Sequence, residues 1–142
     1  MYEKLLLAFD GSEPSHRALL AASELARLAG GEVQVLHIAE SEMLVGGGGF
    51  SGGDVLEGAS GGRAVVKTAV EELEKAGIKA SGTMERSMVG SVAAEILRVA
   101  EEGHCSAIVI GVKGDSKLRA LLVGSVTNKI VHLSQVPVVV VP

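Results

Sequence analysis

Three glycines and a serine in the last third of the chain are spaced as a phosphate-binding loop requires. Gly111 and Gly114 are separated by two residues, and nine residues then precede Gly124-Ser125. Glycine lets backbone N–H groups approach an anion, and a helix starting at Gly124-Ser125 adds unpaired donors and a favourable dipole. The hydroxyls of Ser125 and Thr127 are further donors. The spacing alone leaves a structural alternative open, in which Gly111 ends a strand and Gly124 caps a helix.

A carboxylate and a hydroxyl follow the first apolar run of the chain, in Asp10-Gly11-Ser12. The run from Leu5 to Phe9 predicts a strand that is covered on both faces. Asp before Gly is a common turn pair, and an acid at a helix entry is favoured by the dipole, so Asp10 has a structural explanation. We expect a ligand role as well, because Asp10 ends the strand predicted to be central. Ser12 is expected to cap the next helix.

The histidines and the cysteine predict no metal or proton-relay site. His37 ends an apolar strand, where a pocket wall or a core residue explains it better than a metal ligand does. His16, His104 and His132 have no metal-binding spacing. Cys105 is the single cysteine and is expected to be a small core residue rather than a nucleophile. No catalytic residue is assigned.

Alternating strands and helices must position these residues. Apolar runs predict strands over 5–9, 33–38, 107–110 and 137–141, and alternation with polar residues predicts a strand with one solvated face over 78–85. Helical spacing predicts helices from Ser12 to Ala29, from Val65 to a stop at Gly77, over 91–102, and from Gly124-Ser125 through Val126, Ile130 and Leu133. The prediction is one α/β domain over 1–142, a doubly wound, Rossmann-like five-stranded parallel sheet with helices on both faces and strand 78–85 at an edge. Such sheets bind ligands beyond the carboxyl ends of their strands, so residues 10–12, 39–42, 86–90 and 111 onward are the candidates.

With this glycine pattern the chain resembles the universal stress protein family, whose ATP-binding members carry G-2x-G-9x-G-[S/T] after the fourth strand. The opening strand that ends in Asp10-Gly11-Ser12 and the closing Pro137 to Val141 strand resemble the family too. Only the segment around Gly46 to Gly62 is left out. The resemblance implies ATP with Mg²⁺, or a related adenine nucleotide, as the ligand.

The resemblance also implies roles for individual residues. Asp10 contacts the ribose or adenine, the end of the second strand at His37 and Ile38 lines the adenine pocket, and the motif residues hold ribose and phosphates. Lys113 either meets phosphates or is a solvated loop charge. The predicted nucleotide-binding residues are Asp10, Gly11, Ser12, His37, Ile38, Gly111, Val112, Lys113, Gly114, Gly124, Ser125, Val126 and Thr127.

The expected function is an ATP-dependent regulatory or stress-response module. The alternative is a slow ATPase or nucleotide-handling enzyme on the same scaffold, with Glu40, Glu42 or Asp54 as a base. The phosphate loop offers donors but no general base, which favours binding. A nucleotide-free interaction domain is disfavoured by the intact motif. The segment 46–62 is rich in glycine, whose ordering costs much entropy, so it is expected to be a flexible flap.

Composition and the chain ends define the expected partners and location. The net charge of -4, without a Lys/Arg cluster, gives no footprint for nucleic acid. No apolar run is long enough for a bilayer, and the N-terminus does not resemble a signal peptide. The single cysteine favours a reducing compartment, so a cytoplasmic location is predicted. The apolar terminal strand, 137–141, is expected to form a homodimer because its free edge would otherwise invite uncontrolled pairing.

Overall fold

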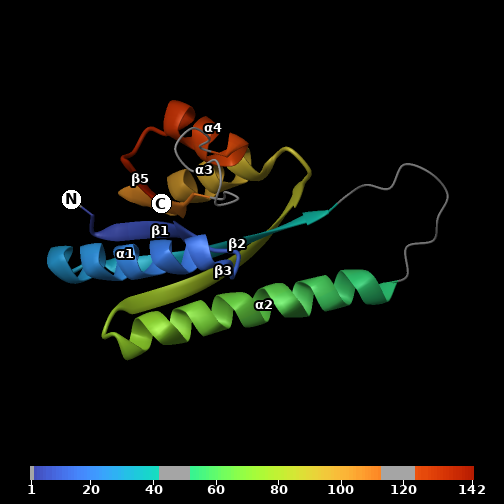
Figure 1. Ribbon diagram of the computed structural model, residues 1–142, viewed down its shortest axis with the longest axis horizontal. Coiled ribbons are helices and arrows are strands. Elements are labelled where there is room, and N and C mark those ends of the chain that lie inside the picture. Colours follow the sequence, from blue (N-terminus) through green and yellow to red (C-terminus); the bar gives the residue numbers. More distant parts are fainter. Residues whose placement is uncertain (1, 42–51, 113–123) are drawn as a thin grey trace.

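Strands and helices alternate strictly along the chain in the computed structural model, which describes residues 2–41, 52–112 and 124–142 (Figure 1). The elements are β1 (Lys4–Ala8), α1 (Glu13–Ala29), β2 (Glu32–Ser41), α2 (Gly52–Lys75), β3 (Lys79–Met88), α3 (Val92–Glu102), β4 (Ala107–Gly111), α4 (Ser125–Leu133) and β5 (Val138–Val141). All the predicted strands and helices are present. None of the helices in these ranges combines the length and the apolar character that crossing a bilayer demands.

The five strands form one parallel sheet in the order β3-β2-β1-β4-β5. The chain builds outward from β1 through β2 to β3, and then crosses to the other side of β1 for β4 and β5. The strand order therefore reverses between β1 and β4, whose carboxyl ends lie side by side. The predicted edge position of β3 is confirmed, and β1 is the central strand.

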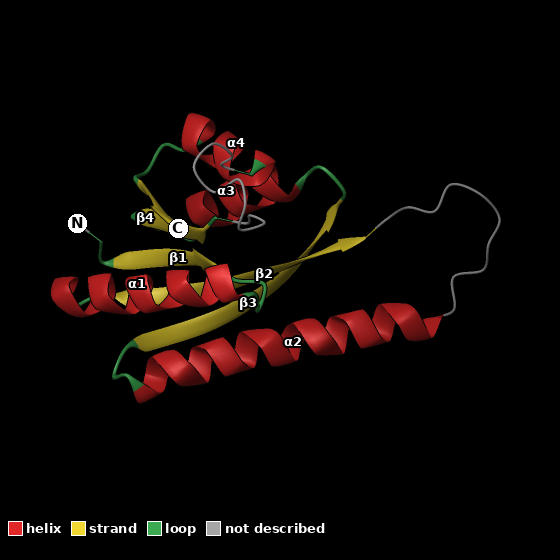
Figure 2. Cartoon of the chain, viewed as in Figure 1, coloured by secondary structure: helices red, strands yellow, loops and turns green. Residues whose placement is uncertain are grey.

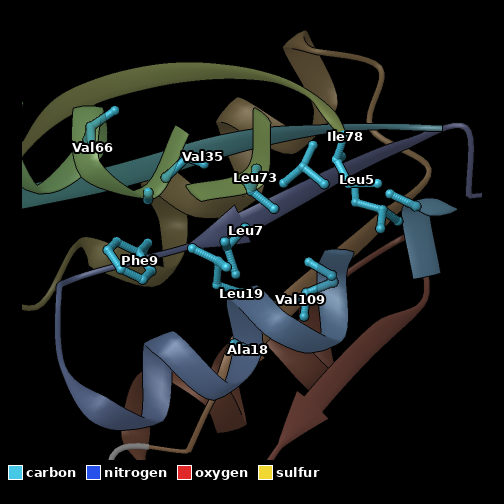
Figure 3. Close-up of a cluster of buried hydrophobic side chains, with 14 of the residues drawn as sticks. Leu5, Leu7, Phe9, Ala18, Leu19, Val35, Val66, Leu73, Ile78 and Val109 are labelled. Atoms are coloured by element: carbon cyan, nitrogen blue, oxygen red, sulfur yellow. The ribbon is translucent and has the colours of Figure 1, made fainter. Parts of the chain in front are cut away.

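Helices cover both faces of the sheet, as predicted: α1 and α2 pack on one face, and α3 and α4 on the other (Figure 2). Successive side chains of a strand point to opposite faces, so β1 contributes Leu5 and Leu7 to one core and Leu6 to the other. Figure 3 shows the first core, where Phe9 lies near Leu7 and Leu19, and where Leu73 of α2 is also buried. These two cores hold the strand ends rigidly.

Helix α1 has the ends that its sequence predicts. The Ser12 hydroxyl accepts a hydrogen bond from the Ser15 backbone N–H at 3.3 Å, which caps the first turn. At the other end Gly30 adopts a left-handed conformation with φ 64°, and its N–H reaches the carbonyls of Ala26 and Arg27. The start of α1 is thereby held directly after β1.

Helix α2 is longer than predicted. Residues 52–62 of the expected flap belong to its N-terminal part, and residues 46–51 lie outside the described residues. Extending an existing helix costs far less than starting one, so the helix can include glycines. Two glycines also permit close packing: a Cβ on Gly62 would lie 2.7 Å from Met84 Sδ, and one on Gly82 would lie 2.3 Å from Val66 Cγ1.

The last turn of α4 also differs from the prediction. Leu133 was expected to face the core, but it is 65% exposed. It is the final residue of a nine-residue helix whose buried residues are Thr127 and Ile130. The helical spacing continues to Leu133, but the packing against the sheet does not.

Candidate functional site

A cleft opens at the point where the strand order reverses, beside the carboxyl ends of β1 and β4 and the first turns of α1, α3 and α4. Most of its wall is aliphatic, and it comprises Ala8, Leu36, Ile38, Val92, Ile96, Ile110 and Val126. Its polar residues are Asp10, Ser12, Ser15, Glu40 and Thr127. A concave apolar site with a few polar groups, at this place in a parallel sheet, is suited to a small ligand.

The turn from Asp10 to Ser12 forms one border of the cleft. One carboxylate oxygen of Asp10 accepts the Ser12 backbone N–H at 2.9 Å, and Gly11 has φ 83°, a conformation that favours glycine. The Ser15 hydroxyl donates to the Ser12 carbonyl at 2.9 Å. The structural and functional interpretations of Asp10 are therefore compatible, because the turn holds an exposed carboxylate at the cleft.

Gly111, the first glycine of the predicted phosphate loop, is required by packing. A Cβ at this position would lie 2.3 Å from the Pro14 carbonyl oxygen and 3.0 Å from the Ser15 backbone nitrogen. The next residue, Val112, donates its N–H to the Val141 carbonyl at 2.8 Å. That donor extends the β4–β5 pairing and is already engaged. The predicted ligand residues Lys113 and Gly114 lie outside the described residues.

The N-terminus of α4 lies at the cleft, as the second half of the motif predicts. Gly124 is the N-cap, and its carbonyl accepts the Asn128 N–H at 2.9 Å. Glycine has no side chain to cap the helix, so Gly124 itself leaves the first-turn N–H groups without a side-chain acceptor. Val126 and Thr127 line the cleft, while Ser125 is exposed. The helix dipole and these donors make this end suited to an anion.

His37 and Ile38 point to opposite faces of the sheet. Ile38 lines the cleft with Leu36, on the face that α3 and α4 cover. His37 is not among the cleft residues; its ring lies toward α2, and Nδ1 is 3.0 Å from the Phe9 carbonyl oxygen. Alternation along β2 separates the two side chains. Only Ile38 of this pair can contact a ligand in the cleft through its side chain.

Several cleft residues escaped the sequence reasoning. Val92 and Ile96 form one side of the wall from α3, whereas none of the predicted candidates 86–90, which span the end of β3 and the turn after it, lines the cleft. Their spacing of four residues at the start of a helix is a usable signal, because it places both on one helical face. Pro14 and Ser15 line the cleft from the first turn of α1. That turn approaches β4 only in the folded chain.

The electrostatics of the cleft suit a ligand that brings its own metal. Among the described residues, no group of three His, Cys, Asp or Glu side chains could hold a metal ion. Asp10 and Glu40 are the carboxylates that line the cleft there. Mg²⁺ needs oxygen ligands and usually takes one or two carboxylates together with phosphate oxygens and water. These two described carboxylates therefore fit Mg²⁺ as an ion carried mainly by phosphates.

Glu95, on the surface of α3, has a lowered pKa because of a neighbour on the same helix. Hydrogen bonding to Arg98 lowers the pKa of Glu95, and both side chains lie outside the cleft. Arg98 also bonds Glu102 at 2.7 Å. This ion-pair network runs along α3 and reaches β3, where a Glu85 carboxylate oxygen lies 3.6 Å from Arg98 Nη2, and none of these residues lines the cleft.

The sheet order and the cleft at the reversal point, bordered by the first turns of α1, α3 and α4, define a Rossmann-like α/β protein with a cleft suited to a small ligand. The family model "Usp: Universal stress protein family" matches residues 1–142. The chain therefore belongs to the universal stress protein family.

Two curated relatives cover nearly the whole chain. Universal stress protein YxiE of Bacillus subtilis is 32% identical over an alignment 151 positions long, which covers 99% of this chain and 99% of the relative. Universal stress protein MJ0577 of Methanocaldococcus jannaschii is 28% identical over an alignment 160 positions long, which covers 99% of this chain and 95% of the relative. The chain thus covers nearly the full length of these two relatives.

Solved structures agree in fold. A universal stress protein from Archaeoglobus fulgidus superposes with a TM-score of 0.76 at 28% identity and covers 100% of both chains. A structure of the universal stress protein from the same organism in complex with dAMP has a TM-score of 0.71 at 27% identity and covers 99% of this chain and 98% of that one. These matches support the predicted five-stranded α/β fold.

Proposed function

We propose that this chain binds ATP with Mg²⁺ in the cleft between β1 and β4 and acts as a nucleotide-dependent regulatory module. The observation that carries the proposal is that an aliphatic slot lies beside the N-terminus of α4 at the reversal of strand order. A base needs an apolar slot, and a phosphate needs N–H donors. The dAMP-bound relative from Archaeoglobus fulgidus supports an adenine nucleotide as the ligand class.

The wall and the rim suggest how the nucleotide would lie. Adenine would pack between Ile38 on the sheet and Val92 and Ile96 on α3, all of which line the cleft. The phosphates would meet the backbone N–H groups that follow Gly124. Asp10 stands at the border between these regions and would face the ribose. Mg²⁺ would neutralise the phosphates and be held mainly by them.

The proposal is a binding role rather than catalysis. The hydroxyls of Ser12 and Ser15 are engaged in the cap of α1. Asp10 and Glu40 are the described carboxylates at the cleft, and Asp10 already accepts a turn hydrogen bond. Phosphoryl transfer needs a group that positions the attacking water. ATP that is consumed on standing with the purified protein, and spared when Glu40 is replaced by Gln, would instead support the slow ATPase.

The site can be tested by titration calorimetry with Mg–ATP on the parent and three variants. Gly124→Val should abolish binding while the fold stays intact, because a β-branched side chain would occupy the space of the phosphate. Ser125→Ala should weaken binding by about 10- to 100-fold, since a hydrogen bond to a charged group contributes about 1.5–3 kcal/mol. Asp10→Ala should weaken ATP but leave inorganic triphosphate nearly unchanged.

Circular dichroism of each variant provides the control for folding. Mass spectrometry of the freshly purified protein should identify a co-purified adenine nucleotide. If folded Gly124→Val binds ATP as tightly as the parent does, the phosphate assignment is wrong and Gly124 is only a helix cap.

We also propose that the chain is a homodimer through β5. This strand is an edge of the sheet, and its four valines are half-buried because α1 and α4 cover them only in part. An apolar edge strand is a template for pairing with another chain. A second copy of β5 would satisfy the free edge and cover these valines.

A further inference from the structure

His37 contacts the backbone at the end of β1 through its side chain. Its Nδ1 lies 3.0 Å from the Phe9 carbonyl oxygen, and since a carbonyl can only accept, Nδ1 carries the proton and donates. The paired residues of β1 and β2 end at Ala8 and Leu36, and the Phe9 N–H then donates to the Leu36 carbonyl at 2.9 Å. The imidazole thus adds one more hydrogen bond between β1 and β2, beyond the last backbone hydrogen bond. The residue that follows Phe9 is Asp10.

Helix α2 packs directly against the same ring. Gly62 is buried, and a Cβ there would lie 2.9 Å from His37 Cδ2 and 3.3 Å from His37 Nε2. The helix backbone therefore occupies the space beside the ring that a side chain would need. The neighbouring Gly61 is exposed, and a Cβ on it would meet nothing within 4 Å. Only one of the two adjacent glycines is pressed against the histidine.

We infer that His37 is a positioning residue that connects α2 with the Asp10 turn, an inference that rests on the nucleotide site proposed above. A displacement of α2 at Gly62 moves the imidazole, the imidazole moves the Phe9 carbonyl, and that carbonyl precedes the turn that places Asp10 and starts α1. Neither His37 nor Gly62 lines the cleft. The His37 side chain therefore gives a change at α2 a hydrogen-bonded route to the nucleotide, in addition to the apolar packing of Val65 of α2 beside Gly11.

Two alanine variants test the connection with matched chemistry. Gly62→Ala and Gly61→Ala make the same substitution at adjacent positions of one helix, so their effects on helix propensity are equal. Gly62→Ala should weaken Mg–ATP binding by about 3- to 10-fold, the equivalent of one disturbed hydrogen bond, while Gly61→Ala binds as the parent does. The same methyl group would also lie 2.7 Å from Met84 Sδ, so the double variant is made in a Met84→Ala background. There, once His37 is also replaced by Ala, Gly62→Ala should add no further loss, because its methyl group meets neither the ring nor the sulfur.

Substitutions of the histidine separate positioning from packing. His37→Leu fills the space without a donor and should weaken binding by about 3- to 10-fold. His37→Asn places an amide N–H near the position of Nδ1 and should restore affinity. In ¹⁵N spectra of the parent, His37 Nδ1 should resonate as a protonated ring nitrogen, and its signal should move in Gly62→Ala but not in Gly61→Ala.

The outcomes distinguish this inference from the proposed function. A parent protein that binds no ATP refutes the nucleotide site itself. If the parent binds ATP, and folded Gly62→Ala and His37→Leu bind it equally well, the positioning role of His37 is refuted while the site stands. Equal losses in Gly61→Ala and Gly62→Ala would show that the effect arises from the helix and not from the ring, which also overturns the inference.

Discussion

Replacement of Gly111 by Ala tests whether this glycine serves packing. The added Cβ would lie 2.3 Å from the Pro14 carbonyl oxygen, 2.6 Å from the Pro14 carbonyl carbon and 3.0 Å from the Ser15 nitrogen. Ordinary contacts begin near 3.4 Å, and all three neighbours are backbone atoms that cannot rotate away. The first turn of α1 must therefore move by about 1 Å relative to β4, an overpacking of the kind that core insertions produce.

The expected loss of stability follows from that movement. Overpacking costs about 1–3 kcal/mol, and the smaller entropy of the unfolded alanine chain offsets about 0.4–1 kcal/mol. A net loss of about 1–2 kcal/mol should remain. For a domain of this size it corresponds to a fall in Tm of roughly 3–10 °C.

Chemical and thermal unfolding of Gly111→Ala and the parent, without nucleotide, measure the effect. Gly61→Ala is the control, because its methyl group meets nothing within 4 Å and should raise stability by about 0.5–1 kcal/mol through helix propensity. An unfolding free energy of Gly111→Ala equal to that of the parent would refute the close approach of α1 to β4. Loss of ATP binding without loss of stability would instead indicate that Gly111 serves in phosphate binding.

Two further predictions concern association and the thiol. Light scattering should show that the parent is a dimer at tens of micromolar, an order chosen to exceed weak dimer Kd values. Val140→Lys should dissociate this dimer, since a lysine blocks edge pairing. A monomeric parent would contradict the β5 interface. Burial raises the pKa of the Cys105 thiol, so the folded state disfavours the thiolate. The contribution of this shift to the free energy of unfolding is fully present below the pKa of the unfolded state. It is lost as pH rises through the pKa of the folded state. Native protein at about pH 8, near the ordinary thiol pKa, should therefore react with iodoacetamide far more slowly than unfolded protein, and equal rates by mass spectrometry would disprove this.

Local patterns determined the elements and one border of the cleft. The apolar run from Leu5 to Phe9, the cap at Ser12 and the stop at Gly30 are short-range signals, so the alternation of strands and helices could be predicted. The same holds for the N-terminus of α4 at Gly124-Ser125. Each of these features depends on residues within one or two turns of each other.

Tertiary structure decided what the individual side chains and glycines do. Sequence shows that His37 and Ile38 point to opposite faces, but only the placement of α2 and α3 tells which face holds the ligand. Gly111 has its packing role because Pro14, almost a hundred positions earlier, lies against it. Likewise, Val92 and Ile96 reach the cleft because α3 returns over the sheet after the edge strand. These facts depend on contacts between segments far apart in the chain, which short-range patterns do not encode.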